Sequence, residues 1–172
     1  MLIHVCSLKT LAETTERVSP SHLLSLVKMD VTPERPEGMP AAHHLHLSFN
    51  DIVEEAVPGQ IAPSSQHVAE ILRFVGGWDH GSPMLIHCWA GISRSTAAAA
   101  IAVAALRPDV SAPRIAEALR AASPTATPNI RLIALADRAL GRAGRLEAAI
   151  RAIGRGAEAG EGIPFFLNAA QL

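Results

Sequence analysis

Four short apolar runs, each bounded by turn residues, predict the strands of a single sheet. They cover residues 2–6, 23–27, 44–49 and 84–87. Runs of this length between Pro, Gly and Ser clusters are typical of buried strands, and the run at 44–49 alternates in part. The fourth run follows the turn signal Gly81-Ser82-Pro83 and stands directly before the most informative part of the chain.

Six further stretches carry apolar residues at helical spacing. Ser65 and Ser111 stand where N-caps are expected, and Gly76-Gly77 ends the second stretch. The stretches are residues 8–15, 65–75, 95–106, 111–119, 129–140 and 146–153. Because strands come first and helices dominate later, we expect an α/β fold: a single central sheet of about four to five strands flanked by helices, with a helix-rich C-terminal half.

One domain accounts for most of the chain. We expect residues 1–153 to form it, since 172 residues suffice for a single core. Residues 50–63 are expected to be an irregular, mobile loop. Residues 154–172 form a C-terminal tail, which we expect to be flexible in its glycine-rich first half and to dock through Phe165 and Phe166.

Composition and charge exclude several classes of protein. Apolar residues make up 49% of the chain, which predicts a folded globular protein, and a net charge of −1 argues against binding to nucleic acid. No apolar run approaches the roughly 20 residues that span a bilayer, and the first residues lack the basic and long apolar regions of a secretion signal. Two cysteines provide no disulfide framework, so we expect a cytoplasmic location. The richness in Ala, Arg and Gly suggests a bacterium with GC-rich DNA.

The segment from Cys88 to Ser95 carries the clearest chemistry. It reads Cys-Trp-Ala-Gly-Ile-Ser-Arg-Ser and joins the fourth predicted strand to the Ala-rich helix. In such a connection, backbone N–H groups and the positive end of the helix face one hollow, which favours an oxyanion. Gly91, in the middle of the loop, suits a positive φ or a close backbone approach.

Cys88 and Arg94 supply the reactive groups of this hollow. A helix N-terminus or a nearby cation favours the thiolate form of a cysteine. Arg94 follows six positions later and can return to the hollow, where its planar fork can bind two oxygens of a tetrahedral anion. Ser95 can donate a hydrogen bond to the thiolate, and His87 can fix the loop through its ring N–H.

The pattern His-Cys-x-x-Gly-x-x-Arg-Ser resembles the signature of the cysteine-dependent protein tyrosine phosphatases, closest to their compact dual-specificity-like branch. The resemblance implies that Cys88 is the nucleophile and that Arg94 binds phosphate and stabilises the transition state. It also implies that Ser95 aids departure of the thiolate and that His87 supports the loop. The remaining residues expected to bind the substrate phosphate are Trp89, Ala90, Gly91, Ile92 and Ser93.

Two more segments extend the resemblance. Leu23-Leu24-Ser25-Leu26 looks like the family's early strand, and Pro128-Asn129 looks like its turn before a late helix. We expect Asn129 to hold this turn near the loop rather than to touch substrate. The resemblance covers most of residues 1–140, and the later residues have no counterpart in it. In the family the loop lies at the C-terminal end of a strand, which is the usual place for ligand sites on such sheets.

The leaving group of a phosphate ester needs a proton, which an acid on a loop before the cysteine supplies in the family. Asp51, directly after the third predicted strand, is the best positional match, and after phosphoryl transfer it could act as base for an attacking water. Glu54 and Glu55 on the same loop are alternatives. Asp79 precedes the strand of Cys88 and is expected at the far end of that strand.

Several other residues have a plainer interpretation. His43, His44 and His46 resemble a metal cluster, but no further ligand is identifiable, and we expect no metal and no cofactor. Cys6 is expected to be a buried strand cysteine rather than a disulfide partner of Cys88. Trp89 has two open interpretations, a wall of the pocket or a side chain packed beneath the loop.

The resemblance implies a phosphoprotein phosphatase that hydrolyses phosphate monoesters through a cysteinyl-phosphate intermediate. No Lys or second Arg stands between Cys88 and Arg94, which argues for a monophosphate ester, most simply phosphotyrosine. The Trp-Pro-Asp acid loop is absent, so phosphoserine and phosphothreonine stay open. The expected partners are a phosphorylated protein or a small aryl phosphate, with phosphate or vanadate in the loop. Two alternatives are a phosphoprotein-binding pseudophosphatase module and a rhodanese-like or arsenate-reductase-like thiol enzyme.

Overall fold

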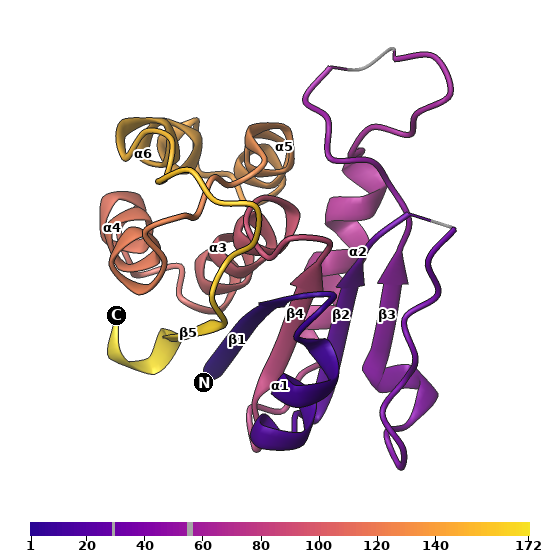
Figure 1. Ribbon diagram of the computed structural model, residues 1–172. Coiled ribbons are helices and arrows are strands. Elements are labelled where there is room, and N and C mark those ends of the chain that lie inside the picture. The colour runs from indigo at the N-terminus through magenta and orange to yellow at the C-terminus, as the bar shows by residue number, and fades with distance from the viewer. Residues whose placement is uncertain (29, 55–56) are drawn as a thin grey trace.

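A five-stranded sheet forms the centre of the computed structural model, which describes residues 1–28, 30–54 and 57–172 (Figure 1). The strand order is β3-β2-β4-β1-β5, and all neighbours are parallel except β5, which is antiparallel to β1. The strands are β1 (Leu2–Ser7), β2 (His22–Leu26), β3 (His44–Leu47), β4 (Met84–Cys88) and β5 (Phe165–Asn168). The four predicted strands and the α/β class are thereby confirmed.

The edge strand β5 was not predicted as a strand. It pairs with β1 in the register Ile3 with Leu167 and Val5 with Phe165. Leu167 is buried and Phe165 packs against the core, whereas Phe166 is 53% exposed and its ring lies against His4. A run of only four residues carries little periodicity. These residues form a strand because they pair with the otherwise unpaired edge of β1.

In the described residues, six α-helices cover the sheet. They are α1 (Leu11–Val18), α2 (Ser65–Gly76), α3 (Arg94–Leu106), α4 (Ala112–Ala122), α5 (Ile130–Ala139) and α6 (Arg145–Ala152), with short 3-10 turns η1 (Ala41–His43) and η2 (Ala169–Gln171). The expected cap at Ser111 is confirmed. The expected cap at Ser65 is wrong, because Ser64 is the N-cap. The Ser64 hydroxyl accepts from the backbone N–H of His67, and the His67 ring accepts from the backbone N–H of Ser64.

Helix α3 lies at the centre of the helical layer. Its side chains from Arg94 to Ala104 are all buried, against β1 and β4 on one side and α2, α4 and α5 on the others. A helix that is apolar all round is stable only in such an enclosed position, and alanine lets the surrounding elements approach closely. The packing places the N-terminus of α3 beside the end of β4.

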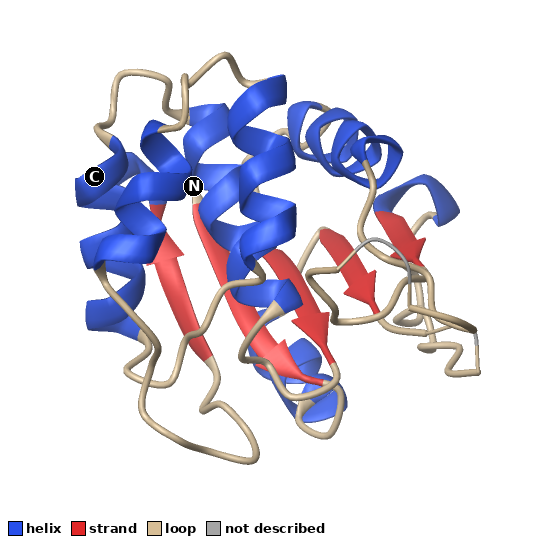
Figure 2. Cartoon of the chain, turned by 90° about the horizontal axis from the view of Figure 1, so that it is seen from above, coloured by secondary structure: helices blue, strands red, loops and turns tan. Residues whose placement is uncertain are grey.

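The two faces of the sheet differ in their cover (Figure 2). Helices α2–α6 lie over one face and enclose the main apolar core, which includes Ile86 and Cys88. A smaller cluster with Cys6, Leu11 and Leu85 lies on the face of α1. Successive residues of β4 therefore point alternately to the two sides, which puts Cys88 and His87 on opposite faces. Within the described residues, no helix is long and apolar enough to cross a membrane.

Candidate active site

A short loop connects the last residue of β4, Cys88, to the first residue of α3, Arg94; we call residues 89–93 the Cys88 loop. Gly91 has φ of +72° in this loop, and a Cβ there would lie 2.9 Å from the Cys6 carbonyl carbon and the Ser7 nitrogen. Only glycine fits both this φ and this approach to β1. The turn that brings Arg94 back to Cys88 thus depends on Gly91.

Cys88 is the last residue of β4, directly before its loop. The residue is 2% exposed, and its Sγ lies 3.1 Å from Oγ of Ser95, which is fully buried. Ser93, the N-cap of α3, makes no side-chain hydrogen bond to the first turn, so the amide donors there are not capped by it. The Ser95 hydroxyl and the positive end of a helix thus stand beside the sulfur.

The guanidinium of Arg94 is held by one hydrogen bond, and another of its N–H donors has no partner among the described residues. Its Nη1 donates to the carbonyl of Phe49 at 2.9 Å, and the side chain is 8% exposed. Its Nε is buried without a hydrogen-bond partner among the described residues, 3.8 Å from Oδ2 of Asp51. A buried donor without a partner is costly, and a tetrahedral oxyanion in the hollow would satisfy it.

Asp51 lies beside Arg94 on the β3 side of the loop. Its Oδ1 accepts from Oγ of Ser93 at 2.7 Å and from Nδ2 of Asn129 at 2.8 Å. Neither residue donates to Oδ2, which faces Arg94, and the carboxyl side chain is 35% exposed. The carboxyl group is therefore oriented by two donors beside Arg94.

Asn129 connects three parts of the site. Its Oδ1 caps α5 by accepting from the N–H of Leu132 at 3.1 Å, and its own N–H donates to the carbonyl of Ser93 at 3.3 Å. Through Nδ2 it holds Asp51. The side chain holds both the turn before α5 and the carboxyl group, and this second contact was not expected from the sequence.

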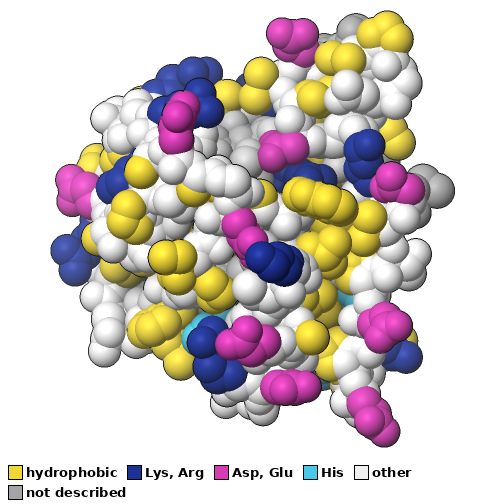
Figure 3. All heavy atoms as spheres, in the orientation of Figure 1, with side chains coloured by type: hydrophobic (Ala, Val, Ile, Leu, Met, Phe, Trp, Pro, Cys, Tyr) yellow, Lys and Arg dark blue, Asp and Glu magenta, His cyan; other side chains and the backbone are white. Residues whose placement is uncertain are grey.

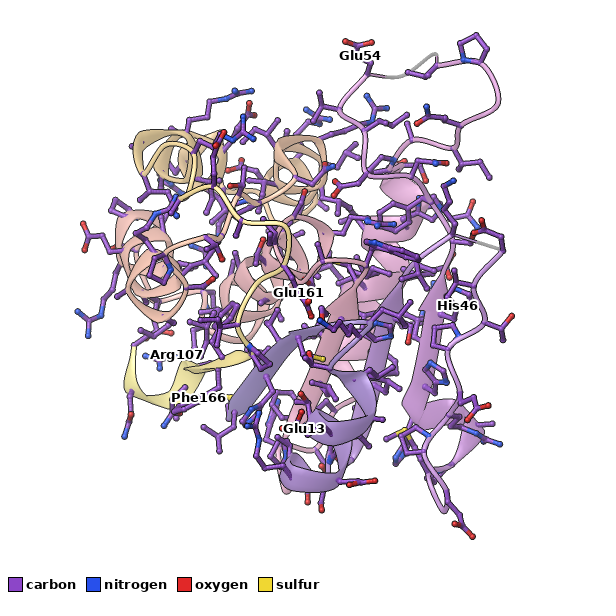
Figure 4. All side chains as sticks on the ribbon, in the orientation of Figure 1. Glu13, His46, Glu54, Arg107, Glu161 and Phe166 are labelled. Atoms are coloured by element: carbon purple, nitrogen blue, oxygen red, sulfur yellow. The ribbon has the colours of Figure 1, made fainter. Side chains whose placement is uncertain are left out.

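The other acids considered from the sequence lie elsewhere. Glu54 lies at the outer end of the loop after β3 and points away from the body of the protein (Figure 4). Asp79 lies in the turn before β4, where it accepts from the N–H of Gly81. Glu55 lies outside the described residues. Asp51 is thus the acid that the described structure brings to Arg94.

His87 lies on the face of the sheet opposite to Cys88. Its Nε2 and Oγ of Ser25 are 2.7 Å apart, and Ser25 is in turn 2.9 Å from Nε2 of His44. Burial lowers the pKa of His87 to about 4, so the ring is neutral near pH 7. This row of polar side chains links β4, β2 and β3; no sequence signal connected the three residues.

The histidines that resemble a metal cluster each have a hydrogen bond to protein. His43 Nδ1 is 3.1 Å from the carbonyl of Ser21, and His46 Nε2 is 3.2 Å from the carbonyl of Val27. Burial lowers the pKa of His44. Across the part of the chain that the structure describes, no group of three or more His, Cys, Asp or Glu side chains is placed to hold a metal ion.

Trp89 and Cys6 have clear places. Trp89 is 63% exposed, so it does not pack beneath the loop. Cys6 is paired in register with His87 and therefore lies on the face opposite to Cys88. Both cysteines are free, and burial raises the pKa of the Cys6 thiol to about 12.

On the face of the molecule that Figure 3 shows, charged side chains of both signs are dispersed and hydrophobic side chains gather near the middle. No broad basic area is visible there.

Solved structures of phosphatases match this fold over most of the chain. DUSP15 is 19% identical, with a TM-score of 0.62 over 87% of this chain and 90% of its own. PTP-2 phosphatase from Cydia pomonella is 17% identical, with a TM-score of 0.61 over 79% and 84%. A mouse dual specificity phosphatase complexed with zinc tungstate is 18% identical, with a TM-score of 0.55 over 83% and 84%.

At the level of sequence, no protein-family model and no curated protein matches the chain. The likeness rests on the arrangement of the sheet and helices, which agrees with the expectation drawn from the signature at Cys88. The chain therefore has the fold of the tyrosine and dual-specificity phosphatases.

Proposed function

We propose that the protein hydrolyses phosphate monoesters through a cysteinyl-phosphate intermediate, with phosphotyrosine as the simplest protein substrate. One observation carries the proposal: the Cys88–Ser95 contact, the unpartnered Nε of Arg94 and the carboxyl group of Asp51 surround a single loop. A nucleophile, an anion-binding fork and an acid in this arrangement are the parts that phosphoryl transfer from an ester needs.

In the first step, the Cys88 thiolate attacks phosphorus as the bond from phosphorus to the ester oxygen breaks. The ester oxygen takes a proton from Asp51 and leaves as a neutral alcohol or phenol. Arg94 and the amide groups of the Cys88 loop stabilise the charge on the three remaining oxygens. The carbonyl of Phe49 holds the guanidinium in place throughout.

In the second step, water attacks the phosphorus of the cysteinyl phosphate and gives a proton to the Asp51 carboxylate. The sulfur–phosphorus bond breaks, and inorganic phosphate and the Cys88 thiolate are released. Ser95, 3.1 Å from the sulfur, stabilises the departing thiolate by donating a hydrogen bond. Asp51 and Cys88 thereby return to their starting protonation states.

The composition of the loop supports a single phosphate as the recognised group. Trp89, Ala90, Ile92 and Ser93 bring no positive charge, so a second phosphate would find no partner there. A phosphatase of similar fold is solved as a complex with zinc tungstate, which supports an oxyanion as a ligand of this fold. We further propose a reducing compartment such as the bacterial cytoplasm, because the nucleophile works only as a free thiolate.

The proposal is tested by p-nitrophenyl phosphate hydrolysis in the presence of a chelator and a reductant. Wild type should turn over, Cys88→Ser should lose turnover while still binding vanadate, and Asp51→Ala should lower kcat most for poor leaving groups. Glu54→Ala is the matched control on the same loop. Activity retained in Cys88→Ser would contradict the covalent mechanism. If only Glu54→Ala lowers kcat, then Glu54 and not Asp51 is the general acid.

An inactive wild type would favour the alternatives. Binding of a phosphopeptide without turnover would identify a phosphoprotein-binding module. Transfer of sulfur from thiosulfate would identify a rhodanese-like enzyme, and reduction of arsenate would identify an arsenate reductase.

A further inference from the structure

The chain between α6 and β5 runs past the N-terminus of α3 and along the Cys88 loop (Figure 1). We call residues 156–163 the C-terminal strap. Its sequence, Gly-Ala-Glu-Ala-Gly-Glu-Gly-Ile, carries no motif, and the resemblance at Cys88 does not extend to it. The strap nevertheless makes contacts to both ends of the loop.

Gly162 makes the closest contact. Its N–H donates to the carbonyl of Ala90 at 2.8 Å. A Cβ at Gly162 would lie 2.9 Å from the carbonyl oxygen of Gly91, which is closer than real side chains approach. Since Gly91 itself lies against the backbone of Cys6 and Ser7, the middle of the loop is held between β1 and the strap.

Glu161 ties the same part of the strap to the sheet. Its Oε1 accepts from Oγ of Ser7 at 2.6 Å, and its Oε2 is 3.3 Å from Nζ of Lys9. Ser7 is fully buried and is paired in register with Cys88. Glu161 points toward this end of the sheet (Figure 4), and the two hydrogen bonds lower the pKa of its carboxyl group.

Both ends of the strap are anchored. After it, β5 pairs with β1. At its start, Gly156 donates to Oγ1 of Thr127 at 3.1 Å, and the N–H of Thr127 donates to the carbonyl of Ile92 at 2.9 Å. The carbonyl oxygens of Ala90 and Ile92, on either side of Gly91, are thus held directly or indirectly by the strap.

We propose that the C-terminal strap positions the Cys88 loop for oxyanion binding, with Gly162 and Glu161 as the positioning residues. The carbonyl oxygens of the loop are bound on its outer side, so the amide hydrogens turn toward the hollow. The strap touches no reacting atom and acts through the loop alone. This inference rests on the proposed phosphatase function.

The first test compares two glycines of the same strap. Gly162→Ala places a methyl group against Gly91, whereas Gly160→Ala meets nothing within 4 Å. Displacing a site by a fraction of an ångström to 1 Å costs up to about 100-fold in rate, so we expect Gly162→Ala to lower kcat/KM for p-nitrophenyl phosphate about 10- to 100-fold. We expect vanadate affinity to fall in parallel and Gly160→Ala to match wild type.

The second test uses the carboxyl group of Glu161. Glu161→Gln keeps an oxygen that can accept from Ser7, and Glu161→Ala removes it. We expect the glutamine variant to retain wild-type vanadate affinity. The alanine variant should bind vanadate about tenfold more weakly, which corresponds to the loss of one hydrogen bond. Rescue by glutamine separates positioning by the hydrogen bond from a role of the charge and of Lys9.

A stability control separates positioning from general damage. Leu146→Ala, in the buried face of α6, should lower Tm at least as much as Gly162→Ala and leave vanadate affinity unchanged below its Tm. If Gly162→Ala binds vanadate and turns over like Gly160→Ala, or if Leu146→Ala loses affinity equally, the strap does not position the loop.

Failure of the proposed function would be recognised separately. A wild type that binds vanadate without hydrolysing esters would contradict the phosphatase mechanism, while isothermal titration with vanadate would still compare Gly162→Ala with Gly160→Ala. A wild type that hydrolyses esters with both glycine variants unaffected would leave the phosphatase standing and overturn the role of the strap.

Discussion

The ends of β1 and β4 each carry a buried cysteine, and the surroundings of the two differ. Cys6 and Cys88 lie on adjacent strands, displaced by a single position in register and turned to opposite faces. Around Cys6 the strand continues into apolar packing with Leu23 and Leu85. Around Cys88 the chain turns at once into a loop, a helix N-terminus and an arginine.

The comparison shows that burial alone does not decide the chemistry of a thiol. Burial raises the pKa of Cys6 to about 12, and the hydroxyls of Thr14 and Thr10 offset this only in part. Cys88 is equally inaccessible as a residue, but its sulfur contacts the Ser95 hydroxyl in the first turn of α3. An ion is stabilised by groups that are already oriented toward it, so the neighbours of a buried thiol matter as well as its burial.

Alkylation should separate the two cysteines most strongly. A thiol with a pKa of about 12 is ionised in only about one molecule in 10⁵ at pH 7, so iodoacetate should modify Cys88 and leave Cys6 intact. Mass spectrometry of peptides after brief labelling measures both. Vanadate should protect Cys88, and Cys6→Ala should label like wild type. Equal labelling of both cysteines would contradict the expected difference in reactivity between Cys6 and Cys88.

Removing the fork beside Cys88 should have the next largest effect. Lysine at position 94 cannot bind both an oxyanion and the carbonyl of Phe49, so we expect Arg94→Lys to lower kcat/KM for p-nitrophenyl phosphate about 10²- to 10³-fold. Arg107→Lys, at the far end of α3 and paired with Asp109, is the matched control and should remain within twofold. A kcat/KM of Arg94→Lys close to that of wild type would refute the role of the guanidinium group.

His87, in register with Cys6 and adjacent to Cys88, should make stability depend on pH. Folding lowers its pKa from 6.5 to about 4, so between these values the unfolded chain binds a proton that the folded chain does not. The free energy of unfolding should therefore fall as pH drops through this window, by at most about 3 kcal/mol. Urea unfolding of wild type and His87→Gln at pH 7 and pH 4.5 measures the difference.

Other buried histidines titrate in both proteins, so only the difference between wild type and His87→Gln reports on His87. We expect the gap in stability to narrow at the lower pH. A gap that stays constant would mean that the ring is not held neutral by its burial.

Removing the hydroxyl group beside each cysteine should have the smallest effect on activity. Ser95→Ala removes one hydrogen bond to the sulfur of Cys88, and we expect kcat to fall about tenfold. Thr14→Val removes the corresponding hydroxyl beside Cys6 and should leave kcat unchanged. Single-turnover measurements should assign the Ser95 effect to hydrolysis of the intermediate; an effect on the first step alone would argue against the leaving-thiolate role.

Much of the fold was readable because each element carried its own periodicity. The runs at β1, β2, β3 and β4 and the helical spacing of α2–α6 are local properties of the chain. The strand β5 was missed because its four residues become a strand only by pairing with β1. The cap of α2 was misplaced by one residue, since Ser64 and Ser65 are alike in sequence and only the reach to His67 distinguishes them.

The candidate site divides in the same way. Cys88, Gly91, Arg94 and Ser95 lie within one loop and helix start, so their convergence follows from short-range geometry. Asp51 could be proposed by its position, but its contacts with Ser93 and Asn129 join three separate elements. The polar row from His87 through Ser25 to His44 crosses three strands, and no local pattern indicates it.

The sequence by itself determined the strand, loop and helix at Cys88, because a glycine, a helix former and an apolar run act on their nearest neighbours. Only the tertiary structure decided which carboxyl group reaches Arg94, which face of the sheet each cysteine occupies and where the last residues lie. Gly162 illustrates the difference: its neighbour Gly91 is far away along the chain, and the need for glycine at position 162 arises only when the two backbones meet.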